Sequence, residues 1–135
     1  MQPMSQPLPL DEKGLPPGYP FDPQREVTPR QLKQRLDAGE KPGADFLLVD
    51  CRREDEWQIT HIEGATLLPL QELPELFDDH LAGNEDKEVI VYCRSGRRSL
   101  DFVASLRRSG FDNARSMAGG VLLWNRDIQP GRPQY

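Results

Sequence analysis

Cysteine is scarce in this sequence: Cys51 and Cys93 are the two among 135 residues. Small secreted domains that depend on disulfides carry a denser set of cysteines. A chain of this length buries enough apolar surface to fold without such cross-links. The low cysteine content therefore argues against a disulfide-stapled secreted domain and favours a reducing, cytoplasmic setting.

Long apolar runs and an excess of positive charge are also missing. The longest apolar runs, at 46–49 and 89–93, are far shorter than the roughly 20 residues that span a bilayer. The first residues lack the basic flank and the apolar stretch of a secretory signal. With 17 Lys and Arg against 22 Asp and Glu, the net charge of -5 disfavours nonspecific binding to nucleic acid. We therefore expect neither a membrane nor a nucleic acid as a partner.

Proline is concentrated in the first part of the chain. Seven of the 13 prolines lie within residues 1–24, a density that forbids helix and favours extended chain. Two interpretations stay open: a disordered linker, or an arm that Tyr19 and Phe21 anchor on the domain. Residues 25–135 are expected to form one folded domain with a short carboxyl-terminal tail, because this length suits a single domain.

Strand-like runs and helical stripes alternate along residues 25–135. Continuous apolar runs at 46–50 and 89–92 predict strands covered on both faces, and shorter strands are expected at 65–68 and 115–117. Thr28 is the expected N-cap of the first helix. Further helices are predicted over 73–81, 99–110 and 121–124, with Leu100 among the buried positions of the second. This alternation indicates an α/β fold with a mainly parallel sheet.

One segment carries the residues for chemistry. A cysteine follows the strand at 89–92 and leads into a polar loop and a helix start: Cys93, Arg94, Ser95, Gly96, Arg97, Arg98 and Ser99. Ligands of open α/β sheets bind at the carboxyl ends of strands, and free amides at a helix start bind anions. Amide donors and neighbouring cations also favour a thiolate. The pattern predicts that Cys93 is a nucleophile of lowered pKa; the alternative is a buried strand-end cysteine beside a solvated basic surface.

Four segments, in order and spacing, resemble the rhodanese family. The loop at 93–99 is similar to its active-site loop, and residues 48–57 resemble its Asp-Val-Arg-Glu stretch. Residues 60–65 resemble its Gly-His-Ile-Pro-Gly-Ala stretch, and residues 110–124 its closing Gly-Gly-x-x-x-Trp segment. Four ordered motifs are far more specific than any one of them. The departures lie outside the loop and concern Cys51, Thr60 and Glu63, where the family has an apolar residue, a glycine and a proline.

The resemblance implies both a fold and a reaction. The fold is a single domain with a five-stranded, mainly parallel sheet and helices on both faces. In the implied reaction Cys93 takes sulfane sulfur from thiosulfate or a persulfide donor, and passes it to a thiol, cyanide or a sulfur-carrier protein. No metal and no organic cofactor is implied. The two ends of the chain also look similar to segments that flank rhodanese domains fused to adenylyltransferases of molybdopterin or thiamine sulfur transfer.

Asp50, Arg52 and His61 are candidate supporting residues. Asp50 and Arg52 are alternate residues on one face of a strand end, where they either orient the Cys93 loop or form a local ion pair, with Glu56 or another neighbour. The local ion pair is the favoured interpretation. His61 is interpreted as a hydrogen-bonded scaffold residue rather than an acid–base group. The acidic cluster at 54–56 is predicted to be a solvated helix face.

Cys51 alternates with its two neighbours and is therefore expected to face the core rather than Cys93. The alternative is that Cys51 lies close enough to Cys93 to resolve a persulfide as a disulfide. Among the loop arginines, Arg98 is predicted to contribute most to the Cys93 thiolate. Arg97 is expected to point to solvent and Arg94 to serve the entrance.

Two other functions compete with sulfur transfer. A cysteine phosphatase would use the same anion-binding loop, but phosphatase loops have the spacing Cys-x5-Arg. Here the spacing is Cys93-x4-Arg98, and Ser99 stands where that arginine is required. The second is a non-catalytic interaction module, a class that usually lacks the cysteine. Retention of Cys93 and the short loop both favour sulfur transfer.

Overall fold

The computed structural model describes residues 8–135, so expectations for the start of the proline-rich arm, including Pro3 and Pro7, lie outside the described residues. The strands are β1 (Glu26–Val27), β2 (Leu47–Asp50), β3 (Thr66–Leu67), β4 (Val89–Tyr92) and β5 (Ala114–Met117). The helices are α1 (Pro29–Asp37), α2 (Glu54–Ile59), α3 (Leu73–His80), α4 (Arg97–Arg108) and α5 (Gly120–Leu123). A short 3-10 turn lies at Leu70–Glu72 and a π-helical turn at Trp124–Ile128.

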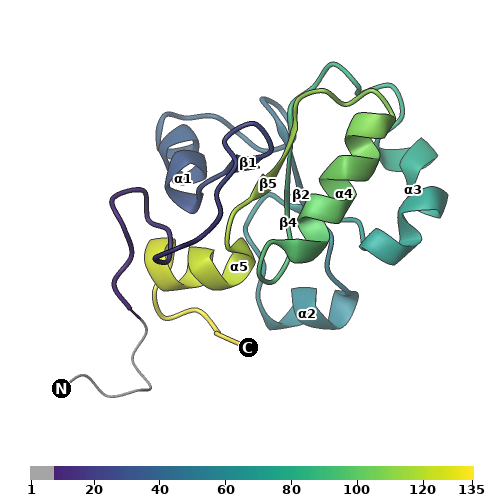
Figure 1. Cartoon of the computed structure of the whole chain (residues 1–135). Helices are drawn as coiled ribbons and strands as arrows, with labels where there is room; N and C mark the ends of the chain where they lie inside the picture. The colour runs from purple at the N-terminus through teal and green to yellow at the C-terminus, as the bar shows by residue number, and fades with distance from the viewer. Residues whose placement is uncertain (1–7) are drawn as a thin grey trace.

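All five strands are parallel and lie in the order β1-β5-β4-β2-β3. Helices α1 and α5 cover one face of the sheet, and α3 and α4 cover the other (Figure 1). Both faces of the central strands are thereby shielded from water, which explains why β2 and β4 are continuous apolar runs. The predicted α/β class, the five parallel strands and the helices on both faces are confirmed.

The carboxyl ends of β2, β4 and β5 meet at one edge of the sheet, next to α2, α5 and the first turn of α4 (Figure 1). Three of the four family-like segments pass through this edge. The sequence order of the chain therefore delivers Cys93, the segment after β2 and the paired glycines after β5 to the same place. The fourth segment includes Ile62, whose amide donates to the buried Tyr92 hydroxyl at 3.0 Å and fastens the loop before β3 to the central strand.

Helix boundaries follow local signals closely, with one instructive shift. The Thr28 side chain accepts from the Gln31 amide, and the Gln31 side chain accepts from the Thr28 amide, a complete capping box for α1. Helix α4 begins at Arg97, about two residues earlier than predicted, because Gly96 makes the turn with a φ of 104°. This start places Phe102 on the sheet and leaves Leu100 36% exposed, so the predicted burial of Leu100 is wrong.

The described part of the proline-rich segment lies on the domain. Leu15 is buried against Ala118 and Leu123, and Tyr19 and Phe21 pack at the edge of the same cluster. In the described part of this segment, Tyr19 and Phe21 are therefore in contact with the domain, as the arm interpretation requires. Within the described part of the chain, no helix has the length and apolar character needed to cross a membrane.

Candidate active site

Cys93 is the first residue after β4, and its sulfur is surrounded by hydrogen-bond donors. The Gly96 amide donates to Sγ at 3.0 Å, and the Ser99 hydroxyl lies 3.4 Å from Sγ. Ser99 is fully buried and is held in turn by a 2.7 Å hydrogen bond to the hydroxyl of Ser116 on β5. The loop curls back over the sulfur, so that Cys93 is only 1% exposed.

These surroundings lower the pKa of Cys93 to about 5. The largest cause is the adjacent Cys51 thiol, followed in the same direction by the hydroxyl and amide of Ser99 and the amide of Gly96, while burial opposes them. A free cysteine titrates near a pH of about 8.5. The lowered pKa favours the thiolate form of Cys93, and the groups that lower it most are uncharged.

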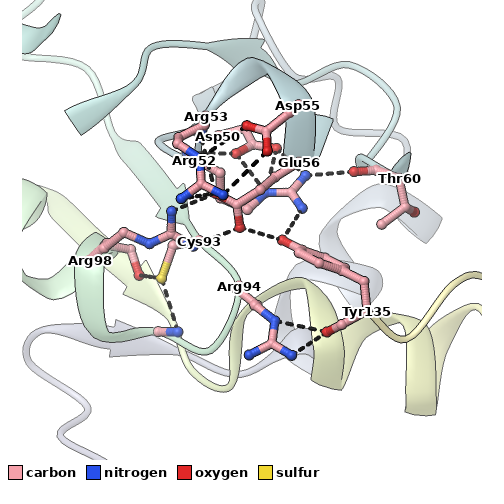
Figure 2. Close-up of polar contacts among 12 residues, drawn as sticks. Asp50, Arg52, Arg53, Asp55, Glu56, Thr60, Cys93, Arg94, Arg98 and Tyr135 are labelled. Carbon is pink, nitrogen blue, oxygen red and sulfur yellow. Dashed lines mark hydrogen bonds and ion pairs between the residues drawn. The ribbon is translucent and has the colours of Figure 1, made fainter. Parts of the chain in front are cut away.

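Arg98 forms a two-pronged ion pair with Glu56 of α2. Its two terminal nitrogens lie 2.6 and 2.9 Å from the two carboxylate oxygens (Figure 2). Glu56 is buried, and this pairing is the main reason that its pKa falls to about 2. One expectation is thereby corrected, because Glu56 is not part of a solvated helix face. The charge of Arg98 interacts with the Cys93 thiolate, but its hydrogen bonds go to Glu56.

A second network extends from β2 to the last residue of the chain. Arg52 and Asp50 form a fully buried ion pair with a shortest contact of 2.6 Å, and Arg52 also donates to the main-chain oxygen of Thr60. The hydroxyl of Tyr135 accepts from Arg52 at 2.6 Å and donates to Glu56 at 2.8 Å. The favoured local ion pair for Asp50 and Arg52 is what the structure has, although Glu56 is not the partner.

Tyr135 also reaches the mouth of the loop. Its main-chain oxygen accepts from the guanidinium of Arg94 (Figure 2), with Nε at 2.8 Å. The centre of its ring lies 5.1 Å from the carbon of that guanidinium. Tyr135 thus connects Arg94, Arg52 and Glu56, three residues from separate parts of the fold. No pattern in the sequence pointed to this residue, because a terminal tyrosine has no spacing relation to the motifs that it joins.

The paired glycines after β5 allow α5 to dock against the loop. Gly120 has a φ of +62°, and a Cβ there would come within 2.4 Å of the main-chain oxygen of Arg94. This close approach lets the Val121 amide donate to the Cys93 carbonyl at 2.8 Å. The Leu122 amide donates to the Arg94 carbonyl in the same way, at 3.1 Å. The loop is therefore held by two main-chain hydrogen bonds from α5 and by the contact between Ser99 and the Cys93 sulfur.

The remaining predicted residues lie around the loop or away from it. Arg94, Ser95 and Arg97 are exposed, and among residues 8–135 Arg97 has neither an ion-pair nor a hydrogen-bond partner, in agreement with its expected position in solvent. His61 stacks on Trp57 with a centroid separation of 3.7 Å and bonds its Nδ1 to the Trp57 main-chain oxygen. The structure therefore places His61 in the scaffold and outside the cysteine loop.

Cys51 is buried in the core, as expected. It also lies beside Cys93, so the two interpretations of Cys51 hold together. Strands β2 and β4 are paired in register up to Asp50 and Tyr92, so Cys51 and Cys93 are the next two residues opposite each other. Both belong to the same core cluster, on the sheet face covered by α3 and α4. Tyr92, which precedes Cys93, belongs to the core cluster on the other face, and the Arg52 guanidinium lies 5.7 Å from the centre of its ring.

Comparison with known proteins agrees with this architecture. The Rhodanese-like domain family matches residues 28–127. A sulfurtransferase of Allochromatium vinosum is 34% identical over 105 residues, which cover 78% of this chain and 92% of the relative. The rhodanese-like domain of an Anabaena protein superimposes with a TM-score of 0.66 at 28% identity, over 84% of this chain and 78% of that one. The fold and the cysteine loop thus define an α/β domain of the rhodanese kind.

The chain belongs to the rhodanese-like family. A probable adenylyltransferase/sulfurtransferase, MoeZ of Mycobacterium tuberculosis, is 34% identical over 81% of this chain, and the match covers 26% of that relative. The chain therefore spans about a quarter of the length of this longer relative. The resemblance to rhodanese domains fused to adenylyltransferases, expected from the two ends of the sequence, is borne out at this level.

Proposed function

We propose that this protein is a sulfurtransferase that carries sulfane sulfur as a persulfide on Cys93. The main support is the environment of the Cys93 sulfur, which accepts from Gly96 and lies against Ser99 at the end of the central strand. A thiolate is the form of cysteine that attacks sulfur. A pKa near 5 keeps Cys93 in that form without a general base.

In the first half of the reaction the Cys93 thiolate attacks the outer sulfur of thiosulfate or of a persulfide donor. A bond forms between Sγ and that sulfur, the donor's S–S bond breaks, and sulfite or a thiolate leaves with the electron pair. Arg94 and Arg97 are the exposed positive charges of the loop and are suited to attract an anionic donor. The loop amides then surround the added sulfur as they surrounded the thiolate.

In the second half an acceptor nucleophile attacks the outer sulfur of the persulfide, and Cys93 leaves as the thiolate. A leaving thiolate of low pKa departs faster, so the same donors assist both halves. We propose a thiol, cyanide or a sulfur-carrier protein as acceptor, and a cytoplasmic location. The sulfurtransferase relatives support transfer in general, and the resemblance to MoeZ supports a protein acceptor.

Phosphate-ester hydrolysis is disfavoured by the same geometry. A phosphatase loop requires an arginine that binds the phosphoryl oxygens, and Arg98 is instead paired with Glu56. Ser99, at the position that such an arginine takes, is fully buried and bonded to Ser116. Neither side chain is arranged to clamp a phosphate ester.

The deciding experiment is intact mass spectrometry after treatment with thiosulfate. We expect the protein to gain the mass of one sulfur atom, to lose it on addition of cyanide, and to form thiocyanate in proportion. Cys93→Ser is expected to gain nothing, whereas Cys51→Ser is expected to gain one sulfur atom, because it keeps the Cys93 nucleophile. Cleavage of an aryl phosphate that disappears in Cys93→Ser, with no sulfur gained, would overturn the proposal.

A further inference from the structure

Cys51 lies where a second nucleophile would reach the Cys93 sulfur. Its amide donates to the Tyr92 carbonyl at 3.0 Å, which extends the β2–β4 pairing by one residue and places the two cysteines side by side. Paired strands lie about 4.8 Å apart, and disulfides join Cα atoms that are roughly 4.4–6.8 Å apart. Both side chains point to the same face of the sheet. A bond between the two sulfurs is therefore within reach of the existing backbone.

Cys51 and an external donor reach the Cys93 sulfur from opposite sides. Cys51 is fully buried in the core beneath the sheet, whereas Arg94 and Ser95 of the loop face solvent. A donor arrives from the solvent side, so the sulfur that it adds lies on the loop side of Sγ. Cys51 then faces the back of the new S–S bond. Thiol–disulfide exchange proceeds by attack of one sulfur on a second with departure of a third. Here Cys51 would attack, the Cys93 sulfur would be attacked, and the added sulfur would leave.

We propose that Cys51 is a catalytic residue that discharges the Cys93 persulfide as hydrogen sulfide; this rests on the proposed function. A bond forms between the sulfurs of Cys51 and Cys93, and the bond between Cys93 and its outer sulfur breaks. The outer sulfur leaves with the electron pair and takes the proton of the Cys51 thiol. The two cysteines are oxidised to a disulfide while the sulfane sulfur is reduced to sulfide, and an external dithiol restores both thiols.

The charge on Cys93 determines when Cys51 can act. The neighbouring Cys93 raises the pKa of Cys51 most strongly, through direct contact, and burial adds to the effect. While Cys93 is a thiolate, Cys51 therefore stays protonated and unreactive. Persulfide formation removes the charge from Sγ and with it the main cause of this suppression. Burial remains, so an accessible acceptor takes the sulfur first, and Cys51 acts on persulfide that finds no acceptor.

The test follows a loaded protein in the absence of any acceptor. The full chain is treated with thiosulfate and then separated from small molecules under anaerobic conditions. Intact mass and sulfide release are followed over time. We expect the added sulfur to disappear and two hydrogens to be lost, with one sulfide released per disulfide formed and a rate that does not depend on protein concentration. Peptide mapping is expected to find the bond between Cys51 and Cys93, and a dithiol is expected to reverse it.

Two variants separate chemistry from packing. Cys51→Ser keeps the size and the donor hydrogen beside Cys93, and Cys51→Val introduces the apolar type that the family has at this position. Both are expected to hold the persulfide for at least about tenfold longer than the unmodified protein, because neither has a second sulfur nucleophile. Equal decay in all three proteins, or decay without a disulfide, would refute the role of Cys51. Failure to load any of them would instead refute the proposed function.

Discussion

At the scale of single residues, Arg98 carries a positive charge near Cys93 but forms its hydrogen bonds with Glu56. The two residues are 42 positions apart and join α2 to the start of α4 with a shortest contact of 2.6 Å. The carboxylate is buried and the guanidinium is about one-third exposed. The positive charge of Arg98 is therefore largely balanced by Glu56 and ties the first turn of α4 to α2, while the amide and hydroxyl donors hydrogen-bond the Cys93 sulfur.

Replacement of Arg98 by Ala is expected to lower stability and to leave the acidity of Cys93 nearly unchanged. The loss of the partner leaves a buried carboxylate unpaired, at a cost of about 2 kcal/mol in the free energy of unfolding. This contribution is present above the ordinary glutamate range and fades as the pH falls toward the lowered Glu56 pKa of about 2. Urea unfolding at several pH values measures it, and the pH profile of Cys93 alkylation measures the acidity.

Arg97→Ala is the matched control, since Arg97 is a neighbouring, exposed arginine. It is expected to change stability by less than about 0.5 kcal/mol. A rise of the Cys93 alkylation midpoint by about one pH unit or more in Arg98→Ala, with no such rise in Arg97→Ala, would restore Arg98 as a main source of the thiolate.

At the scale of elements, the docking of α5 against the cysteine loop depends on a missing side chain. Gly120→Ala would combine a positive φ with a Cβ 2.4 Å from the Arg94 carbonyl oxygen. We expect a loss of about 2 kcal/mol or more and slower sulfur loading, because α5 must withdraw the amides that hold the loop. Thermal unfolding and the mass gain after thiosulfate treatment report the two effects.

Gly39→Ala supplies the comparison at this scale. Gly39 also has a positive φ, of +96°, but nothing lies within 4 Å of the Cβ position. This variant is expected to show the backbone strain alone, about 1 kcal/mol, with normal loading. If the two variants lose the same stability and both load normally, the close approach of α5 has no part in holding the loop.

The elements themselves were largely predictable, and the contacts between them were not. The apolar runs of β2 and β4 and the capping box of α1 are local patterns, and local patterns survive folding when packing agrees with them. Glu56 could not be distinguished from Glu54 and Asp55, because its burial comes from Arg98 on another element. The side of the sheet that Cys51 shares with Cys93 required the register between β2 and β4, which sequence alternation within β2 does not reveal.

At the scale of the whole molecule, the proline-rich arm and the segment after β5 pack as one unit beside the loop. Leu15 is 2% exposed and lies against Ala118, next to the paired glycines. The Tyr19 hydroxyl donates to Glu26 at 2.7 Å and accepts from the Gly119 amide at 3.3 Å. The arm therefore contributes to the shape of the site although it precedes every motif of the family.

Leu15→Ala is expected to destabilise the protein by about 2 kcal/mol, the low end for a buried leucine, because its cluster is small. Sulfur loading is expected to slow as well, since the support beneath Gly119 is lost. Leu8→Ala, at a leucine that is 60% exposed in the same arm, is the control and should change neither. Equal behaviour of the two variants in urea unfolding would contradict an ordered role for the arm.

Strand β4 lies in the middle of the sheet, with β5 on one side and β2 on the other, and Cys93 is the residue that follows it. Some proteins hold a reactive group on a long flexible side chain that carries it between separate sites. Here the Cys93 sulfur lies at the end of a strand that is hydrogen-bonded on both sides. In the proposed reaction the persulfide stays at this position, so donor and acceptor would bind at the same place in turn. The order of the proposed steps then depends on which molecule binds at the loop, and a molecule that stays bound delays the binding of the next one.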